Sequence, residues 1–330
     1  MKLLALLSGG LDSTLSVKVV MDLGFDVEAV HFTTPFCQCD KCSLDTVSDE
    51  LGVKVHHVFL GQEFLDLLLD PPHGFGSRMN ICIDCRILML KKAKELADNI
   101  GVKYFVTGEV LNQRPFSQRF PAMTLIEREA GLEGRILRPL SGKLLPETEL
   151  EKTGQVDRNM LHSIQGRRRI PQMQLAEELE IRDYPCPSGG CLLTDPQYSE
   201  RLREHLAHEG KVTPVQALLL KLGRHFRLGD VKVIVGRNEK ENNIIQSMAE
   251  AQGIPQMSVV EHMGPTTLIQ GETDEGVIDQ CAALTIRYSD APRDAHVRVS
   301  YVDGDLNYSL LKAITDEELE AIQGTMVLAV

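Results

Sequence analysis

Three short segments of the chain carry residue types that can do chemistry together. Residues 8–13, SGGLDS, combine glycines, two serines and an aspartate directly after an apolar run. Cys82 and Cys85 form a close pair, and Cys191 follows two glycines. Bare glycine N–H groups cradle phosphate, whereas thiols carry sulfur or bind soft metal ions. This combination indicates a phosphate site with sulfur chemistry beside it.

The SGGLDS segment lies between an expected strand, residues 3–7, and an expected helix, residues 12–23. A glycine-rich turn at a helix N-terminus holds a phosphate through backbone N–H groups and the positive end of the helix dipole. Asp12 suits Mg²⁺ rather than direct phosphate contact. We therefore expect this segment to bind a nucleotide phosphate through the residues Ser8, Gly9, Gly10, Leu11, Asp12 and Ser13.

The elements that must position these residues alternate between strand and helix at first and change in character later. Over the first 110 residues, strands are expected at residues 3–7, 27–32, 53–59 and 104–107, and helices at residues 12–23 and 85–100. This alternation predicts an α/β fold with a doubly wound, mainly parallel sheet. Beyond about residue 205, short strands are expected at residues 231–235, 258–260, 282–288 and 297–302. We expect domains at residues 1–200 and 201–330, the second a smaller α+β domain.

Composition excludes several classes of protein. The 330 residues are 43% hydrophobic, and the longest apolar runs fall far short of a membrane span of ~20 residues. Eight cysteines that mostly cluster are more typical of metal or thiol chemistry in the cytoplasm than of a disulfide framework. The net charge is −12, yet residues 201–240 hold nine Lys and Arg against four Asp and Glu. A basic band of this kind can still bind a polyanion.

The SGGLDS segment resembles the PP-loop of the ATP pyrophosphatases, which cleave ATP to AMP and pyrophosphate. Residues 106–113 and 137–140 resemble stretches of tRNA 4-thiouridine synthetases. Cys85 stands where the related tRNA 2-thiouridine synthetases carry their catalytic cysteine, and GGCLL around Cys191 resembles the segment with their second one. The resemblance covers residues 1 to about 195 and implies an adenine nucleotide α-hydrolase fold. It also places His31, Phe32 and Gly108 at the ATP site.

The resemblance implies an ATP-dependent tRNA sulfurtransferase that adenylates a uridine carbonyl oxygen and replaces it with sulfur. Cys85, Cys191 and Asp12 would be catalytic. Cys82 stands where the persulfide-type enzymes typically carry Asp, which favours a [4Fe–4S] cluster on Cys82, Cys85 and Cys191 over a persulfide relay. A zinc site with Cys186 as fourth ligand is the remaining alternative. For Cys37, Cys39 and Cys42, a second metal site, a disulfide and a thiol-rich loop remain open.

RNA binding is expected from the second domain, because the THUMP domain of known 4-thiouridine synthetases has no counterpart before the PP-loop in this sequence. Residues 235–243 resemble the GRN-x-x-EN element of the NFACT-R domain, an RNA-binding module. Arginine with neighbouring aromatic residues suits phosphate contacts and base stacking. The expected RNA-binding residues are Arg167, Arg168, Arg169, Arg224, Arg227 and Arg237.

Two other functions fit parts of the pattern. A PP-loop ligase or amidase acting on a small metabolite would not need the basic band. An RNA-binding quality-control protein with a vestigial ATP site would not need an intact SGGLDS segment. The resemblance favours 4-thiouridine over 2-thiouridine, and it implies a sulfide or persulfide carrier as sulfur donor. It leaves the oligomeric state open, a homodimer included.

Overall fold

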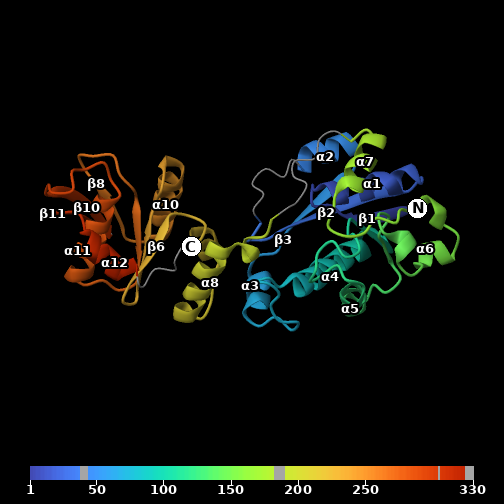
Figure 1. Cartoon of the computed structure of the whole chain (residues 1–330), viewed down its shortest axis with the longest axis horizontal. Coiled ribbons are helices and arrows are strands. Elements are labelled where there is room, and N and C mark those ends of the chain that lie inside the picture. The colour runs from blue at the N-terminus through green and yellow to red at the C-terminus, as the bar shows by residue number, and fades with distance from the viewer. Residues whose placement is uncertain (38–43, 182–189, 304, 324–330) are drawn as a thin grey trace. The chain divides into compact units, whose positions relative to one another are not determined.

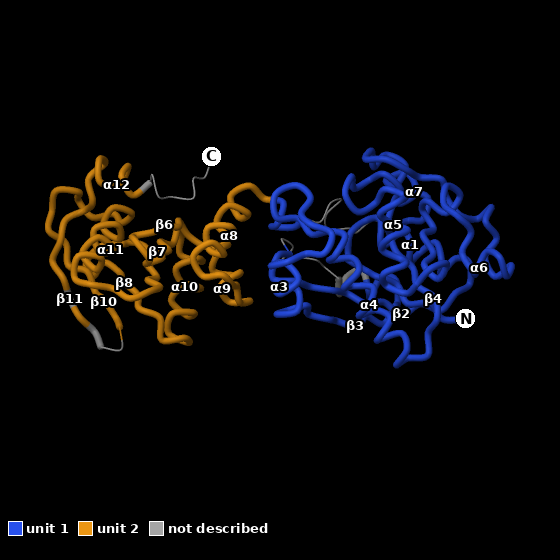
Figure 2. Tube along the Cα trace, turned by 90° about the horizontal axis from the view of Figure 1, so that it is seen from below, with its two compact units in different colours: residues 1–194 blue, residues 195–330 orange. Residues whose placement is uncertain are grey.

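The computed structural model describes residues 1–37, 44–181, 190–303 and 305–323, and it divides into two compact units. Unit 1 comprises Met1–Thr194 and unit 2 comprises Asp195–Val330 (Figures 1 and 2). Cys39, Cys42 and Cys186 lie outside the described residues, as does most of the loop before Cys191. Among the described residues, no helix is both long and apolar enough to cross a membrane.

Unit 1 is built on a parallel sheet of five strands in the order β3-β2-β1-β4-β5. Its elements are β1 (Lys2–Leu6), α1 (Leu11–Asp22), β2 (Asp26–Thr33), α2 (Leu44–Leu51), β3 (Lys54–Phe59), α3 (Gln62–Leu69), α4 (Cys82–Ile100), β4 (Tyr104–Thr107), α5 (Phe120–Ala130), β5 (Ile136–Leu137), η1 (Gly142–Leu144), α6 (Glu149–Lys152), η2 (Arg158–Met160), α7 (Ile170–Glu178) and η3 (Leu192–Thr194). The strand order reverses direction between β1 and β4, which is where open α/β sheets bind their ligands.

Helices cover both faces of this sheet, as is expected when a strand such as β1 is apolar along its whole length. Leu3 and Ala5 of β1 pack with Val17 of α1, whereas Leu4 packs with Leu90 of α4 on the opposite face. Successive strand residues point to opposite faces, so a strand buried on both sides has no polar position. The predicted α/β fold with a doubly wound, mainly parallel sheet is confirmed, and each strand and helix expected before residue 110 is present.

Unit 2 is built on an antiparallel sheet of six strands in the order β11-β10-β8-β9-β7-β6. Its elements are α8 (Pro196–Glu209), α9 (Pro214–Leu219), β6 (Arg224–Leu228), β7 (Val231–Val235), α10 (Glu239–Gln252), β8 (Gln256–Val259), β9 (Thr267–Gln270), α11 (Glu275–Arg287), β10 (Val297–Asp303), β11 (Asp305–Leu311) and α12 (Asp316–Gln323). The strand expected at residues 282–288 is wrong, because these residues form the end of α11. Asp274 starts that helix by accepting a hydrogen bond from the Val277 N–H at 2.8 Å.

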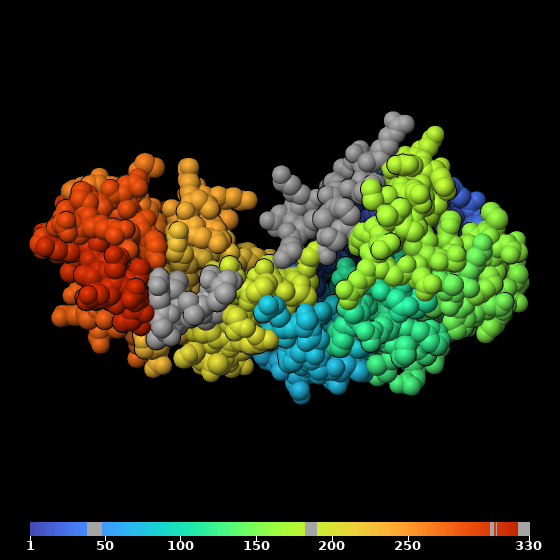
Figure 3. Space-filling model, in the orientation of Figure 1, coloured from blue at the N-terminus to red at the C-terminus, as the bar shows by residue number. Residues whose placement is uncertain are grey.

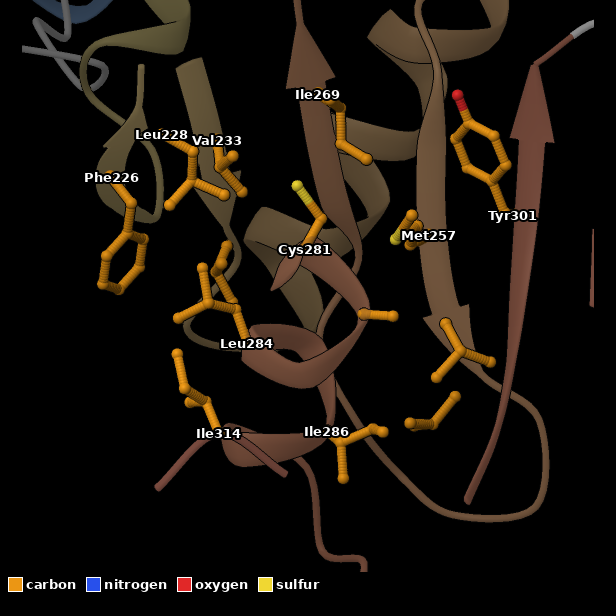
Figure 4. Packing of buried hydrophobic residues seen from close by; sticks show 14 of the residues in the cluster. Phe226, Leu228, Val233, Met257, Ile269, Cys281, Leu284, Ile286, Tyr301 and Ile314 are labelled. Atoms are coloured by element: carbon orange, nitrogen blue, oxygen red, sulfur yellow. The ribbon is translucent and has the colours of Figure 1, made fainter. Parts of the chain in front are cut away.

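The larger core of unit 2 lies between its sheet and α11 (Figure 4). Cys281 is fully buried there among apolar side chains. The opposite face of the sheet is covered by α10, whose Ile245 packs with Ile234 of β7. Burial raises the pKa of the Cys281 thiol to about 12, so this cysteine is protonated and inert.

Glu28 on β2 offers a test of how charge pairing stabilises unit 1. Its carboxylate lies 2.6 Å from Lys2 Nζ and 2.7 Å from His56 Nε2. The hydrogen bonds from Lys2 and then from His56 lower the pKa of Glu28 to about 2. A lowered pKa gives stability that is complete above the ordinary carboxyl value of 4.5 and is lost as pH falls towards 2.

We expect Glu28→Gln to cost about 1 kcal/mol of unfolding free energy at pH 7, because the pair is partly exposed. The difference from the wild type should vanish as the pH falls towards 2, where the native carboxyl is protonated. Urea unfolding at pH 7 and at the lowest pH at which both proteins stay folded measures this change. Glu133→Gln is the matched control, because Glu133 is exposed and forms no ion pair with a described residue. An equal loss at both pH values would contradict the pairing argument.

Candidate active site

A cavity of about 290 Å³ opens at the carboxyl ends of β1 and β2. It lies beside the point where the strand order reverses, and its walls come from the SGGLDS segment, the end of β2, the start of α4 and the segment around Cys191. The predicted nucleotide-binding and thiol residues that line it are Ser8, Gly9, Gly10, Leu11, Asp12, Ser13, His31, Phe32, Cys82, Cys85, Gly108 and Cys191.

The SGGLDS segment forms a compact turn at the N-terminus of α1. Gly9 has a φ of +73°, a conformation that favours glycine. The Ser13 hydroxyl donates to the Gly10 carbonyl at 2.8 Å and accepts from the Ser8 N–H at 3.2 Å. These bonds fix the turn at the N-terminus of α1, and its residues line the cavity. A glycine-rich turn at a helix N-terminus is an arrangement that binds an anion.

Gly108, directly after β4, lies against this turn. A Cβ at position 108 would sit 2.5 Å from Ser13 N and 2.6 Å from the Asp12 carbonyl carbon. Only glycine allows β4 and the start of α1 to approach so closely. Gly108, the middle residue of Thr107-Gly108-Glu109 (the TGE stretch), is therefore needed to shape the turn as well as the cavity.

Asp12 is held by side chains from two other elements. Its Oδ2 accepts a hydrogen bond from Gln113 Nε2 at 2.7 Å, and Gln172 Nε2 of α7 in turn donates to Gln113 Oε1 at 3.1 Å. Arg169 lies 3.6 Å from the same carboxylate oxygen. The other oxygen, Oδ1, is buried and has no hydrogen-bond partner among the described residues. A buried carboxylate oxygen without a donor suits a bound cation.

Cys82 and Cys85 stand on the first turn of α4. The Asn80 side chain accepts a hydrogen bond from the Cys82 N–H at 2.8 Å, which fixes the helix start. Asp84 between them is buried and accepts from His73 Nδ1 at 2.7 Å. The spacing of three residues places both thiols on the cavity side of one helix.

Two backbone hydrogen bonds bring Cys191 to these thiols. The Met79 N–H donates to the Leu193 carbonyl at 3.1 Å, and the Leu192 N–H donates to the Phe36 carbonyl at 2.9 Å. Cys191 forms an isolated antiparallel bridge with Cys37, which also lines the cavity. Sequence reasoning groups Cys37 with Cys39 and Cys42, whereas the structure places it beside Cys191.

The surroundings of Cys85 and Cys191 oppose their ionisation. Burial, followed by the neighbouring Cys82, raises the pKa of Cys85 well above its usual range, and burial raises the pKa of Cys191 to about 12. The positive charge of Arg86 acts to lower the pKa of Cys85, but burial outweighs it. Within the described part of the chain, no three His, Cys, Asp or Glu side chains are arranged as a metal site.

A buried charge network that sequence analysis missed lies under the cavity wall. Glu109 of the TGE stretch pairs with Arg138 Nε at 2.9 Å and with Arg86 Nε at 3.2 Å, and Arg138 also pairs with Glu127. Burial acts to raise the pKa of Glu109, but Arg138 and then Arg86 outweigh it and hold the pKa below its usual range. The network holds Arg86 next to Cys85 in the cavity wall.

The six arginines predicted to contact RNA have different surroundings. Arg167 and Arg168 are exposed and form no ion pair with another described residue, and the segment before α7 forms part of the surface of unit 1 (yellow-green in Figure 3). Arg169 lies in the cavity beside Asp12. Arg224 stacks over the Tyr288 ring with 4.6 Å between the guanidinium carbon and the ring centroid.

Arg227 and the neighbouring aromatic residue have a structural role instead. The Arg227 side chain is 7% exposed and pairs with Glu204 of α8 at 2.6 Å, and Lys232 pairs with the same carboxylate at 2.7 Å. Phe226 is 2% exposed in the core of unit 2. Arg227 and Phe226 are therefore not available for phosphate contact or base stacking, which corrects the expectation for this part of the basic band.

The GRN-x-x-EN element also has a clear structural purpose. Asn238 caps α10 by accepting from the Glu241 N–H at 3.0 Å, and Arg237 pairs with the Glu241 carboxylate. Asn242 Oδ1 accepts from the Thr266 N–H at 3.2 Å and leaves no room for a side chain at Gly236. The residue pattern is that of a strand–turn–helix corner.

In unit 1, a glycine-rich turn follows the first strand of a parallel sheet and faces a cavity lined by thiols. Residues 1–146 match the family model described as thiamine biosynthesis protein (ThiI), and residues 223–322 match the NFACT protein RNA binding domain. These matches confirm the two resemblances drawn from the sequence, the first unit to PP-loop tRNA thiouridine synthetases and the second to the NFACT-R domain.

Known proteins of two kinds align with the chain. The tRNA-specific 2-thiouridylase MnmA of Pseudomonas fluorescens (strain SBW25) is 21% identical over 94% of this chain and 84% of that protein. A probable tRNA sulfurtransferase of Caldanaerobacter subterraneus subsp. tengcongensis is 30% identical over 43% of this chain and 37% of that protein. Among solved structures, a 4-thiouridine synthetase–RNA complex with bound ATP matches with a TM-score of 0.35 at 21% identity, covering 55% of this chain and 51% of that one.

Proposed function

We propose that this protein is an ATP-dependent tRNA uridine sulfurtransferase acting in the cytoplasm. The observation that carries the proposal is that the phosphate turn and four cysteines, Cys37, Cys82, Cys85 and Cys191, line one cavity. A nucleotide held by its phosphates and a sulfur group are then brought to the same substrate atom, as a thiolation needs. The similarity to enzymes named as tRNA sulfurtransferases and 2-thiouridylases supports tRNA as the substrate.

The residues of the turn would bind the pyrophosphate end of ATP, with the α-phosphorus turned towards the thiols. A uridine carbonyl oxygen attacks that phosphorus and pyrophosphate leaves, so the oxygen becomes part of AMP. Sulfur then attacks the activated ring carbon and AMP departs. Asp12 would hold Mg²⁺ through its buried Oδ1, the one carboxylate oxygen there without a donor among the described residues, and the ion would neutralise phosphate charge.

For the sulfur-carrying group, we propose a [4Fe–4S] cluster held by Cys82, Cys85 and Cys191. The three thiols line one cavity, and a bound cation would stabilise the thiolates of Cys85 and Cys191, whose ionisation burial otherwise opposes. A cluster held by these three residues would supply iron that can take up hydrosulfide. Iron and acid-labile sulfide analysis of anaerobically purified protein tests this part, and stoichiometric zinc without iron would refute it.

The experiment that tests the function is mass spectrometry of tRNA nucleosides after anaerobic incubation with ATP, Mg²⁺ and sulfide. We expect a new thiouridine that requires ATP, with sulfur at C4 rather than C2. A product with sulfur at C2 would support the same class of enzyme, a tRNA sulfurtransferase, but would show that the modified position is C2 and not C4. If cluster-loaded protein releases pyrophosphate with a small metabolite and never thiolates tRNA, the ligase or amidase alternative is correct.

Arg167 and Arg168 should contribute to tRNA binding, because they are exposed cations next to Arg169 in the cavity wall. Removing one phosphate-binding cation lowers the slope of log affinity against log salt by about one unit. We expect the Arg167→Glu/Arg168→Glu double variant to weaken tRNA binding about tenfold at ~0.15 M salt and to flatten that slope by about two.

Filter binding of tRNA over a range of salt concentrations measures both effects. Arg128→Glu is the matched control, because Arg128 is exposed on α5 and does not line the cavity. Arg224→Glu tests unit 2 in the same assay. Unchanged affinity in the double variant, with weaker binding by Arg224→Glu, would move the RNA-binding surface from this segment to unit 2.

A further inference from the structure

Cys37 is a fourth thiol in the cavity, and neither the resemblance nor the proposed cluster gives it a role. It follows β2 directly and lines the same cavity as Cys82, Cys85 and Cys191. Of these three cysteines, Cys191 is the one that pairs with Cys37 through the backbone. The two residues are partners in an antiparallel bridge, flanked by the hydrogen bond from the Leu192 N–H to the Phe36 carbonyl at 2.9 Å.

This bridge has the geometry that a disulfide needs. Residues directly opposite each other in antiparallel pairs have Cα atoms about 4.5–5.5 Å apart and side chains on the same face. Disulfides join cysteines whose Cα atoms are about 4.4–6.8 Å apart. The antiparallel pairing of Cys37 with Cys191 is therefore of the kind that a disulfide can join.

The Cys37 sulfur is in contact with Thr34. The Thr34 N–H donates to Cys37 Sγ at 3.3 Å, and the Thr34 hydroxyl lies 3.5 Å from the same atom. These contacts hold the Cys37 sulfur in place at the cavity wall, and both Cys37 and Cys191 are partly exposed.

We infer that Cys37 is the resolving thiol of this site and forms a reversible disulfide with Cys191. The inference rests on the proposed function for the use of the released sulfur. The Cys191 thiol attacks the outer sulfur of a persulfide donor, R–S–SH, the S–S bond of the donor breaks, and the proton passes to the departing sulfur, which gives Cys191–S–SH and R–SH. The Cys37 thiolate then attacks Cys191 Sγ, the S–S bond to the outer sulfur breaks, and HS⁻ leaves. Two thiols are oxidised to one disulfide, and one sulfane sulfur is reduced to hydrosulfide.

This pairing connects the donor to the rest of the cavity. The hydrosulfide is set free in the cavity that the phosphate turn lines, where an adenylated uridine would be bound. Because the disulfide and a cluster both need Cys191 Sγ, they exclude each other. Cys37 therefore acts on the chain that holds no cluster. An external dithiol reductant, itself oxidised to a disulfide, would return Cys37 and Cys191 to thiols and restore Cys191 as a ligand.

The test uses the full chain purified without added iron and treated with sodium tetrasulfide as the sulfane sulfur probe. The protein is desalted, alkylated with iodoacetamide and digested with trypsin, and hydrosulfide released after desalting is measured in parallel. We expect a linked peptide pair containing Cys37 and Cys191, with about one hydrosulfide released per disulfide formed. Cys37→Ser should lose the link and keep a persulfide on Cys191, and its hydrosulfide release should fall at least tenfold.

Cys39→Ser and Cys186→Ser are the matched controls, because Cys39 shares a tryptic peptide with Cys37 and Cys186 shares one with Cys191. Both controls should keep the link and the hydrosulfide release. A link from Cys191 to Cys85, or undiminished release from Cys37→Ser, would refute the inference. The readout contains neither tRNA nor ATP, so a failure of thiolation with an intact Cys37–Cys191 link would reject the proposed function alone.

Discussion

Cys85→Ser is expected to abolish tRNA thiolation, by about a thousandfold or more, while pyrophosphate release remains within a few-fold of the wild type. Serine nearly keeps the size of the side chain and removes one of the three sulfur ligands of the proposed cluster. The phosphate turn belongs to α1 and does not contact position 85 through any hydrogen bond among the described residues. Adenylation should therefore still occur in the variant when sulfur transfer does not, and adenylated tRNA should accumulate.

Pyrophosphate release and tRNA thionucleosides, measured on the same reaction, separate the two steps. Cys281→Ala is the matched control, because Cys281 is buried in the core of unit 2 and does not line the cavity. It should cost about 1 kcal/mol of stability for a small void and leave thiolation intact. If Cys85→Ser loses pyrophosphate release as completely as thiolation, Cys85 supports the ATP site and the separation into two steps is wrong.

The parts of the site that could be predicted from the sequence are those carried by contiguous residues. The SGGLDS segment contains its own strand end, turn and helix start, so its geometry follows from local propensity and glycine placement. Cys82 and Cys85 are similarly local, because a spacing of three on a helix fixes their common side. The α/β alternation of unit 1 can be recognised because each strand is a short apolar run bounded by glycine or polar residues.

The remaining parts depend on pairings between distant residues. The bridge between Cys37 and Cys191 arises from the end of β2 meeting a loop from much later in the chain, and no local pattern indicates it. The ion pairs of Glu109 with Arg86 and Arg138 likewise join three separate elements. The strand prediction for residues 282–288 fails because a short apolar run suits a strand or a buried helix, and the cap at Asp274 is the signal that distinguishes them.

The basic band of unit 2 shows why charge in a sequence is a weak guide to a binding surface. Arg227 and Lys232 lie under the surface and share the carboxylate of Glu204. A buried cation that is paired with a carboxylate has a structural role. The carboxylate neutralises its charge, so the pair adds little to the electrostatic potential at the surface. Arg167 and Arg168 in unit 1 lack such partners among the described residues, and they are the better candidates for phosphate contact.

Gly108→Ala is expected to reduce pyrophosphate release at least about a hundredfold, because the added methyl group would push against backbone. The Cβ would lie 2.5 Å from Ser13 N and 2.6 Å from Ser13 Cα, and the backbone of a helix start cannot rotate away as a side chain can. Overpacking of this kind costs about 1–3 kcal/mol of stability. The larger loss is in function, since a shift of the turn by even ~1 Å misplaces the N–H groups that bind the phosphates.

ATP affinity by calorimetry, pyrophosphate release and thermal unfolding of the same variant distinguish these effects. Gly276→Ala in the first turn of α11 is the control, because its Cβ would meet only the Asp274 side chain at 3.4 Å and alanine favours a helix. It should leave ATP binding unchanged and change stability by less than about 1 kcal/mol. A Gly108→Ala variant that binds ATP as tightly as the wild type would show that β4 and α1 can separate without loss. The close approach would then be a consequence of packing in unit 1 and not a requirement of the phosphate site.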